Sequence, residues 1–185
     1  PSMRAGLARI PEALRSARLR RWHLLGGLGG ALFILSQVFS VPYLGVALFT
    51  VVGVASQTMS GLIVDRIGLG PGGKRSITSS RLIAVIISVG AVILVSIDKF
   101  DVANLSLVAI LAVLLARSGT SVQAAINARV SEASGSAYSA ALVSFVVGTL
   151  FLVIIFGVVS VTGVLPVSGA VVEWWLYTGG LIGAV

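Results

Sequence analysis

Apolar residues in this chain form long blocks separated by short polar segments, unlike the closely spaced pattern of a soluble core. At 1.5 Å per helical residue, five blocks are close to the length that crosses the ~30 Å hydrocarbon core of a bilayer. A sixth block, 174–185, reaches only about 18 Å. The blocks are Leu24 to Ser40, Tyr43 to Val64, Leu82 to Ile97, Leu105 to Ala125, Ala137 to Val161 and Trp174 to Val185. The pattern predicts an all-α, polytopic transmembrane helical bundle with five full spans and a truncated sixth.

The polar segments divide the predicted spans into two groups of three. A basic segment, 1–23, precedes the first group, which occupies 24–97 and has a tight turn at Pro42. A hydrophilic, glycine-rich loop, Asp65 to Arg81, separates its second and third spans and is expected to be a flexible connector. A short extracytoplasmic connection, 98–104, leads to the second group, 105–185, whose last span is truncated.

Composition agrees with lipid as the surrounding solvent. The 185 residues are 57% hydrophobic and 10% charged, whereas soluble domains carry about 25% charged residues. The net charge of +7 does not indicate nucleic-acid binding, because the basic residues lie between the apolar blocks, where they set membrane orientation.

The basic residues gather on one side of the predicted membrane. The N-terminal segment, the 65–81 loop and a predicted turn at Asn127 to Ser136 share that side. They hold 11 of the 13 Lys and Arg residues: Arg4, Arg9, Arg15, Arg18, Arg20, Arg21, Arg66, Lys74, Arg75, Arg81 and Arg129. The other side holds only Lys99, and Arg117 lies within the fourth span. The positive-inside rule therefore predicts that the basic side is cytoplasmic.

The sequence offers no set of residues for catalysis or metal binding. It contains no cysteine and one histidine, and its six acidic residues all lie outside the predicted spans. Gly68 to Arg75 fits most of the Walker A pattern, but Arg75 replaces the required hydroxyl residue and transmembrane helices flank the loop. We therefore expect no enzyme activity, no cofactor and no metal.

An internal repeat links the first and last blocks. Both the segment from Trp22 to Ala31 and that from Trp175 to Ala184 read W-x3-G-G-L-x-G-A. Five spans separate the two starts, so the copies cross the membrane in opposite directions, as in transporters with inverted repeats. Each copy contains a G-x-x-x-G pair, Gly26 with Gly30 and Gly179 with Gly183, which is expected to pack helices closely. A further small-residue pair, Ser144 with Gly148, is expected to do the same. Trp22, Trp174 and Trp175 are expected to anchor the membrane interface.

Four polar residues inside the spans are candidates for a substrate pathway: Gln57, Arg117, Gln123 and Asn127. The amides can donate and accept hydrogen bonds to a polar solute, or instead join neighbouring helices. Asn127 has a further alternative, that it simply ends the fourth helix. The charge of Arg117 either faces a cavity or partner, or snorkels toward the cytoplasmic headgroups.

Several motifs resemble the YdcZ-type family of the drug/metabolite transporter (DMT) superfamily. They are Gly26-Gly-Leu-Gly-Gly-Ala31, Val41-Pro-Tyr-Leu-Gly45, Ser56-Gln57, Asp65-Arg-Ile-Gly68, Gln123-Ala-Ala-Ile-Asn127-Ala-Arg129, Ala140-Ala-Leu-Val-Ser144-Phe145-Val-Val-Gly148, and Trp174-Trp175 with Gly179-Gly180. The resemblance implies a ten-helix protein of two five-helix halves. This chain would then hold helices three to five of one half and one to three of the next. Ser56, where the family usually has glycine, and Arg117 depart from the pattern.

Together these features predict a multi-pass protein of the bacterial cytoplasmic (inner) membrane. We expect a secondary transporter that exports small metabolites or drugs by alternating access between inverted repeats. The alternative is a non-transporting membrane scaffold or accessory subunit whose Gly-rich faces bind a partner protein. The expected partners are a small-molecule substrate, the lipid bilayer and a second copy of the chain, with no nucleic acid.

Overall fold

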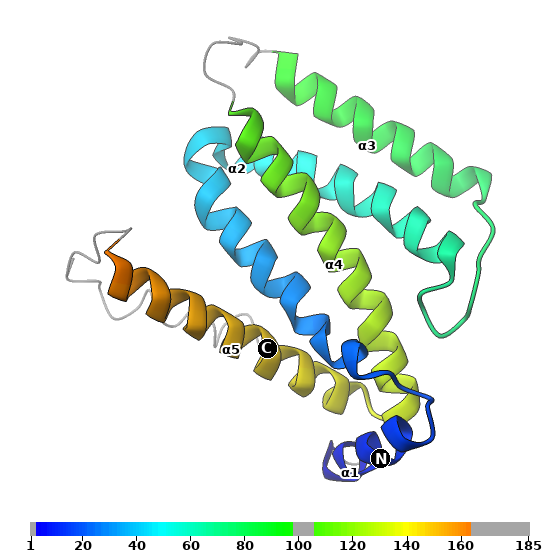
Figure 1. Cartoon of the computed structure of the whole chain (residues 1–185). Coiled ribbons are helices and arrows are strands. Elements are labelled where there is room, and N and C mark those ends of the chain that lie inside the picture. Colours follow the sequence, from blue (N-terminus) through cyan, green and yellow to red (C-terminus); the bar gives the residue numbers. More distant parts are fainter. Residues whose placement is uncertain (1–2, 98–105, 164–185) are drawn as a thin grey trace. The chain divides into compact units, whose positions relative to one another are not determined.

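The computed structural model describes residues 3–97 and 106–163, and this part of the chain is helical without a strand (Figure 1). In chain order the elements are α1 (Met3–Arg15), the short 3-10 helix η1 (Arg21–Gly26), α2 (Gly27–Ile67), α3 (Ser79–Ile97), α4 (Leu107–Ser134) and α5 (Ala137–Thr162). The chain forms two compact units, Pro1–Leu152 and Val153–Val185, and all contacts below lie within the first. The predicted connection at 98–104 and the sixth span lie outside the described residues.

Helix α2 contains both of the first two predicted spans. Its backbone leaves the helical conformation at Gly45, where φ is 71° and ψ is 162°, a combination that essentially only glycine adopts. Figure 1 shows the helix folding back at its upper end. The turn predicted at Pro42 was therefore misplaced, because Pro42 lies inside the helix and Gly45 provides the break. The two limbs, 27–44 and 46–67, are roughly 27 Å and 33 Å long, each close to bilayer thickness.

Helix α4 extends further than the sequence pattern predicted. It runs to Ser134 and ends where Gly135 adopts a left-handed conformation with φ of 67°. The turn predicted at 127–136 is therefore wrong, and so is the alternative that Asn127 ends the helix. Polar residues mark the end of the apolar span, but no helix-breaking residue follows before Gly135, so the helix continues beyond it.

Helices α2 and α4 form the central packing interface of the first unit. Its apolar core consists of Leu44, Leu48, Phe49, Val52, Ala109 and Val113. Serine hydroxyls line the same interface: Ser40 donates to the Ala109 carbonyl at 3.1 Å, and Ser56 donates to the Leu114 carbonyl at 2.7 Å. The hydroxyls of Ser60 and Ser121 lie 2.8 Å apart. Small side chains and hydrogen bonds of this kind hold helices together in lipid, where apolar burial provides little driving force.

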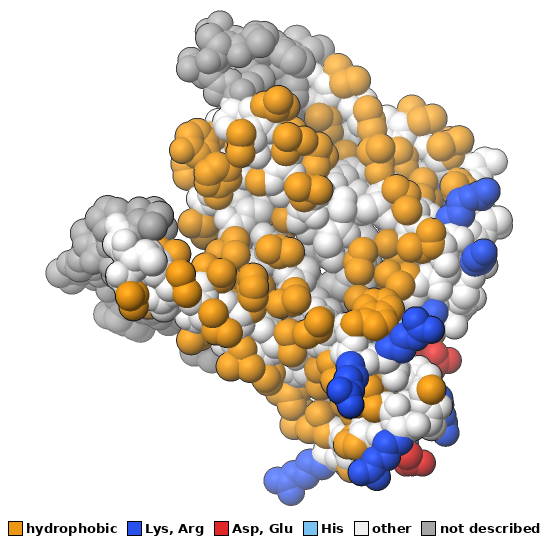
Figure 2. Space-filling view, viewed as in Figure 1, with side chains coloured by type: hydrophobic (Ala, Val, Ile, Leu, Met, Phe, Trp, Pro, Cys, Tyr) orange, Lys and Arg blue, Asp and Glu red, His pale blue; other side chains and the backbone are white. Residues whose placement is uncertain are grey.

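The remaining helices pack around this pair. Helix α1 places Ile10 and Ala13 against Val130 of α4 and Ala140 of α5. Helix α3 packs against α2 and exposes isoleucines such as Ile86 and Ile87, as expected of a lipid-facing helix. On the face in Figure 2, Lys and Arg side chains gather over α1, η1 and the α2–α3 loop, and apolar side chains cover the helices. The prediction of an all-α membrane helical bundle is confirmed.

Three helical segments are long and apolar enough to cross a membrane: Arg21–Ile67, Leu107–Ser134 and Ala137–Thr162. The first, at 47 residues, is too long for one crossing and is divided by the break at Gly45. Ser79–Leu94 is a shorter apolar helical stretch.

Close backbone contact between α2 and α5 generates a stability prediction. A methyl group at Gly27 would lie 2.8 Å from the Gly148 nitrogen and would also meet the Ser144 carbonyl oxygen. Because backbone atoms cannot move aside as a side chain can, Gly27→Ala should lower the free energy of unfolding by about 1–3 kcal/mol. Denaturation of the purified protein in detergent, followed by circular dichroism, measures this change.

Gly90→Ala is the matched control, because nothing lies within 4 Å of a methyl group at Gly90 in the described structure. Equal destabilisation by both substitutions would contradict the proposed contact between α2 and α5.

Candidate functional site

A cavity of about 410 Å³ lies between the second limb of α2, the loop after it and α4. Its walls combine polar groups with glycine and alanine, which leave room for a bound molecule. The lining residues are Gln57, Gly61, Val64, Asp65, Gly70, Pro71, Gly72, Gly73, Arg75, Ser121, Ala124, Ala125 and Ala128. Of the four predicted pathway residues, only Gln57 lines this cavity.

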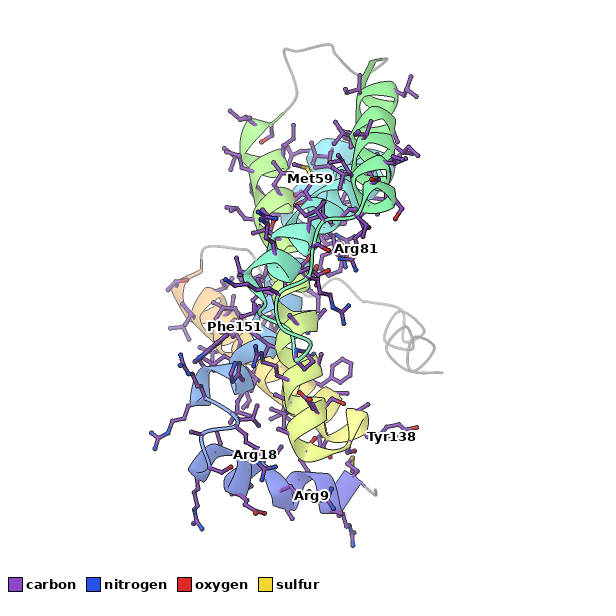
Figure 3. The ribbon with its side chains drawn as sticks, turned by 90° about the vertical axis from the view of Figure 1, so that its right-hand side faces the viewer. Arg9, Arg18, Met59, Arg81, Tyr138 and Phe151 are labelled. Carbon is purple, nitrogen blue, oxygen red and sulfur yellow. The ribbon has the colours of Figure 1, made fainter. Side chains whose placement is uncertain are left out.

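The loop that bounds the cavity is tied to the helices. Arg129 of α4 donates to the carbonyl of Gly68 at 3.0 Å and also to that of Leu69. The Arg75 backbone N–H donates to the Asp65 carbonyl at 2.9 Å, and the Asp65 carboxylate pairs with Arg81. Figure 3 shows Arg81 where the loop meets α3. These contacts hold both ends of the predicted connector against the helices.

The inner part of the cavity is formed by hydrogen-bonded groups of α2 and α4. The Ser121 hydroxyl donates to the Gln57 carbonyl at 2.9 Å. This bond leaves the side-chain amide of Gln57 to face the cavity and the neighbouring Arg117, whose Nη1 lies 3.5 Å from Gln57 Oε1. Gln57 is exposed, so the amide is accessible from the cavity.

The Arg117 guanidinium lies between the two limbs of α2. Its Cζ is 4.1 Å from the centre of the Phe33 ring and 5.6 Å from that of Phe49. A methyl group at Gly53 would be 2.6 Å from Arg117 Nε, so glycine makes space for the guanidinium. Cation–π attraction of about 0.5–2 kcal/mol per ring offsets part of the cost of removing the charge from water. The side chain thus packs against an aromatic ring from each limb of α2.

Arg117 uses few of its hydrogen-bond donors in the described part of the chain. Nε is buried without a hydrogen-bond partner, and the bond to Gln57 is long for a charged donor. The one ion pair found among the described residues joins Arg81 to Asp65, so no described carboxylate neutralises Arg117. A guanidinium with free N–H groups beside a cavity can bind the carbonyl or anionic group of a small molecule.

The other two pathway candidates, Gln123 and Asn127, lie elsewhere. Their amide groups donate to the Ser144 hydroxyl at 3.1 Å and 3.2 Å, which joins α4 to α5. Gly30 lies against Gln123 and Gly26 against Asn127, so the first G-x-x-x-G pair meets these same side chains. The structure therefore places the four candidates in two pairs: Gln57 lines the cavity and contacts Arg117, whereas Gln123 and Asn127 contact Ser144.

The remaining predicted packing and interface residues are only partly described. Ser144 and Gly148 both contact the α2 backbone at Gly27. The Trp22 ring is 40% exposed and lies 4.1 Å from the His23 ring, centre to centre. Trp174, Trp175, Gly179 and Gly183 lie outside the described residues.

Sequence reasoning missed several residues that shape the cavity. The sequence pattern did not predict that Asp65, Arg75 and Arg129 position the loop beside the cavity. Residue spacing did indicate polar faces on two helices: Ser56 and Ser60 are spaced i,i+4, and Ser118 and Ser121 are spaced i,i+3. It did not indicate that these two faces meet. No group of three His, Cys, Asp or Glu side chains among the described residues could hold a metal ion.

The fold and the site define a multi-helix membrane protein with a cavity between its helices that both polar and apolar residues line. The chain belongs to the DMT_YdcZ family, described as "Putative inner membrane exporter, YdcZ", whose model matches residues 4–94 and 108–185. This match confirms the resemblance found in the sequence motifs. No curated protein and no solved structure shows significant similarity to the chain.

The cavity generates a labelling prediction that uses the absence of native cysteines. Gln57→Cys should react with a water-soluble maleimide roughly tenfold faster than Ser40→Cys, because thiol reactivity requires exposure and Ser40 is fully buried. Mass spectrometry of the labelled protein in vesicles measures both rates.

Ser139→Cys provides a second buried control at a site distant in sequence. Labelling of Gln57→Cys as slow as that of both buried controls would show that water does not reach the cavity.

Proposed function

We propose that this protein is a secondary transporter that exports small metabolites or drugs across the inner membrane. The observation that carries the proposal is the cavity between α2 and α4, which Gln57 lines and which Arg117 adjoins. A membrane helix seldom places a charged residue near its middle unless that residue faces a cavity or partner. Membership of an inner-membrane exporter family supports the direction of transport and gives no support to an enzyme activity.

We infer that Gln57 and Arg117 contact the transported molecule. The amide of Gln57 can exchange hydrogen bonds with a polar solute, and the buried Ser121 hydroxyl positions Gln57 by donating to its carbonyl. Arg117 favours solutes with a carbonyl or anionic group, while the nearby Phe33 ring provides an apolar surface. Small amphipathic metabolites combine these two properties.

The proposed mechanism is alternating access between two inverted repeats. Support comes from the two W-x3-G-G-L-x-G-A copies in the sequence, whose predicted orientations are opposite, and from the two separate segments that match the family model. In such transporters, substrate binds near the bilayer midplane and the repeats rock around it. Access would alternate as α2, which belongs to one repeat, moves against α4, which belongs to the other.

A specific observation favours the alternative of a non-transporting scaffold. Gln123 and Asn127 are satisfied by Ser144, as expected if polar residues serve only to join helices. We therefore assign these two residues to helix packing. The same explanation does not extend to Arg117, since its Nε is buried without a partner.

Transport by the purified protein in proteoliposomes tests the proposal. Flux of a panel of labelled amphipathic metabolites should be detected, with and without a proton gradient. Arg117→Gln should lower flux of the transported solute about tenfold or more, because removing a charge-assisted hydrogen bond costs roughly 1.5–3 kcal/mol.

Arg4→Gln is the control, because it removes one positive charge from α1 at a distance from the cavity. No flux for any solute, together with a stably co-purifying protein partner, would overturn the transporter proposal in favour of a scaffold. Equal loss of flux in both variants would contradict a direct role for Arg117.

A further inference from the structure

Two cavities flank α1, and they differ in charge. One, of about 330 Å³, is lined by Arg9 and Arg18 together with Glu12 and Glu132, so its formal charges balance. The other, of about 600 Å³, is lined by Arg15, Arg20 and Arg21 with no acidic residue. Three arginines around one unbalanced cavity repel one another unless an anion lies between them.

The backbone holds these arginines together at a conformational cost. Ala17, two residues after the end of α1, has a φ of 58°, a left-handed conformation that is unfavourable for alanine. This turn brings the chain back, so that the Leu19 N–H donates to the Ala13 carbonyl at 3.0 Å. Beyond it, the Arg20 N–H donates to His23 Nδ1 at 2.9 Å and fixes the start of η1. The chain thus returns Arg20 and Arg21 to the side of Arg15.

The rest of the cavity wall is apolar. Pro11, Leu14, Ala17 and Leu19 complete the lining. Helix α1 buries Gly6, Ile10 and Ala13 and is the most amphipathic helix described, which is typical of a helix lying along a membrane interface. Arg9 and Arg18 are labelled at this end of the unit in Figure 3. The charge distribution of the sequence predicts that this end lies at the cytoplasmic face.

Arginines beside an apolar wall at the cytoplasmic interface match the two chemical parts of an anionic lipid. Guanidinium groups bind phosphate oxygens through charge-assisted, often bidentate hydrogen bonds. The glycerol backbone and upper acyl chains can contact the apolar residues. The cytoplasmic leaflet is also where anionic lipids attract basic segments near the membrane.

We propose that the cavity lined by Arg15, Arg20 and Arg21 binds the phosphate headgroup of an anionic phospholipid. The bound lipid neutralises the three guanidinium groups and anchors α1 and η1 at the membrane surface. This site does not depend on the transport activity proposed above, because it is formed by the segment that precedes α2.

Fluorescence quenching of Trp22, which follows Arg21 and is partly exposed, provides the test. Trp174→Phe and Trp175→Phe leave Trp22 as the only tryptophan. The protein is reconstituted in phosphatidylcholine vesicles containing a minor fraction of either acyl-brominated phosphatidylglycerol or acyl-brominated phosphatidylcholine.

Quenching of Trp22 fluorescence should be severalfold stronger with the anionic lipid. Arg15→Gln/Arg20→Gln should remove most of this preference and bring the ratio of the two quenching values close to one, since each arginine near an anionic surface contributes about fivefold.

Arg9→Gln/Arg18→Gln is the matched control, because it removes the same charge from the balanced cavity. It should retain most of the preference, and Arg15→Lys/Arg20→Lys should do so as well. Native mass spectrometry, which counts retained phosphatidylglycerol molecules, gives an independent readout and shows that the variants are folded.

Three results would overturn the proposal. One is equal quenching by both brominated lipids in the unsubstituted protein. Another is equal loss of preference in the two double glutamine variants, which would indicate a general electrostatic effect. The third is displacement of the lipid by soluble glycerol phosphate at low concentration, which would identify a site for a free phosphate compound.

Discussion

The packing of helices in the first unit depends on hydrogen bonds between them, because the surrounding lipid cannot form hydrogen bonds in their place. Lipid offers neither donors nor acceptors, and apolar side chains gain little by leaving it. The α2–α4 interface meets this constraint with serines, whose short side chains let the helices approach and whose hydroxyls bond to carbonyls across the interface, as at Ser40 and Ser56. Gly27 and Gly148 achieve the same close approach for α2 and α5 by having no side chain at all.

The same constraint makes the surroundings of Arg117 informative about its function. The hydroxyls of Ser40, Ser56, Ser60 and Ser121 all have partners along this interface, so the cost of burying them is offset locally. Arg117 instead relies on the rings of Phe33 and Phe49 and one long contact with Gln57, and its Nε has no partner. A charge that is held this incompletely next to a cavity is consistent with a group that completes its bonding with a ligand. By contrast, Gln123 and Asn127 have a complete local explanation in Ser144.

Charge shapes the polar end of the unit in two ways. Arg129 and Arg81 act on the α2–α3 loop through carbonyls and the Asp65 carboxylate, and so determine where one wall of the cavity lies. Arg15, Arg20 and Arg21 have no such acidic partner in their cavity. The positive-inside rule treats all of these residues alike, because it concerns only the side of the membrane on which they lie. Their separate roles follow from which groups the fold places opposite each one.

The sequence by itself determined the features that depend on local composition. Block length and hydrophobicity predicted the helices, the membrane environment and the small-residue packing motifs, since a helix in lipid satisfies its backbone within a single segment. The sequence did not determine where the helices break or which polar groups meet. The break at Gly45 and the extension of α4 to Ser134 reflect backbone geometry that hydropathy does not record. Only the tertiary structure decided that Gln57 pairs with Arg117 while Gln123 and Asn127 bind Ser144, because hydrogen-bond partners depend on how helices far apart in sequence pack together.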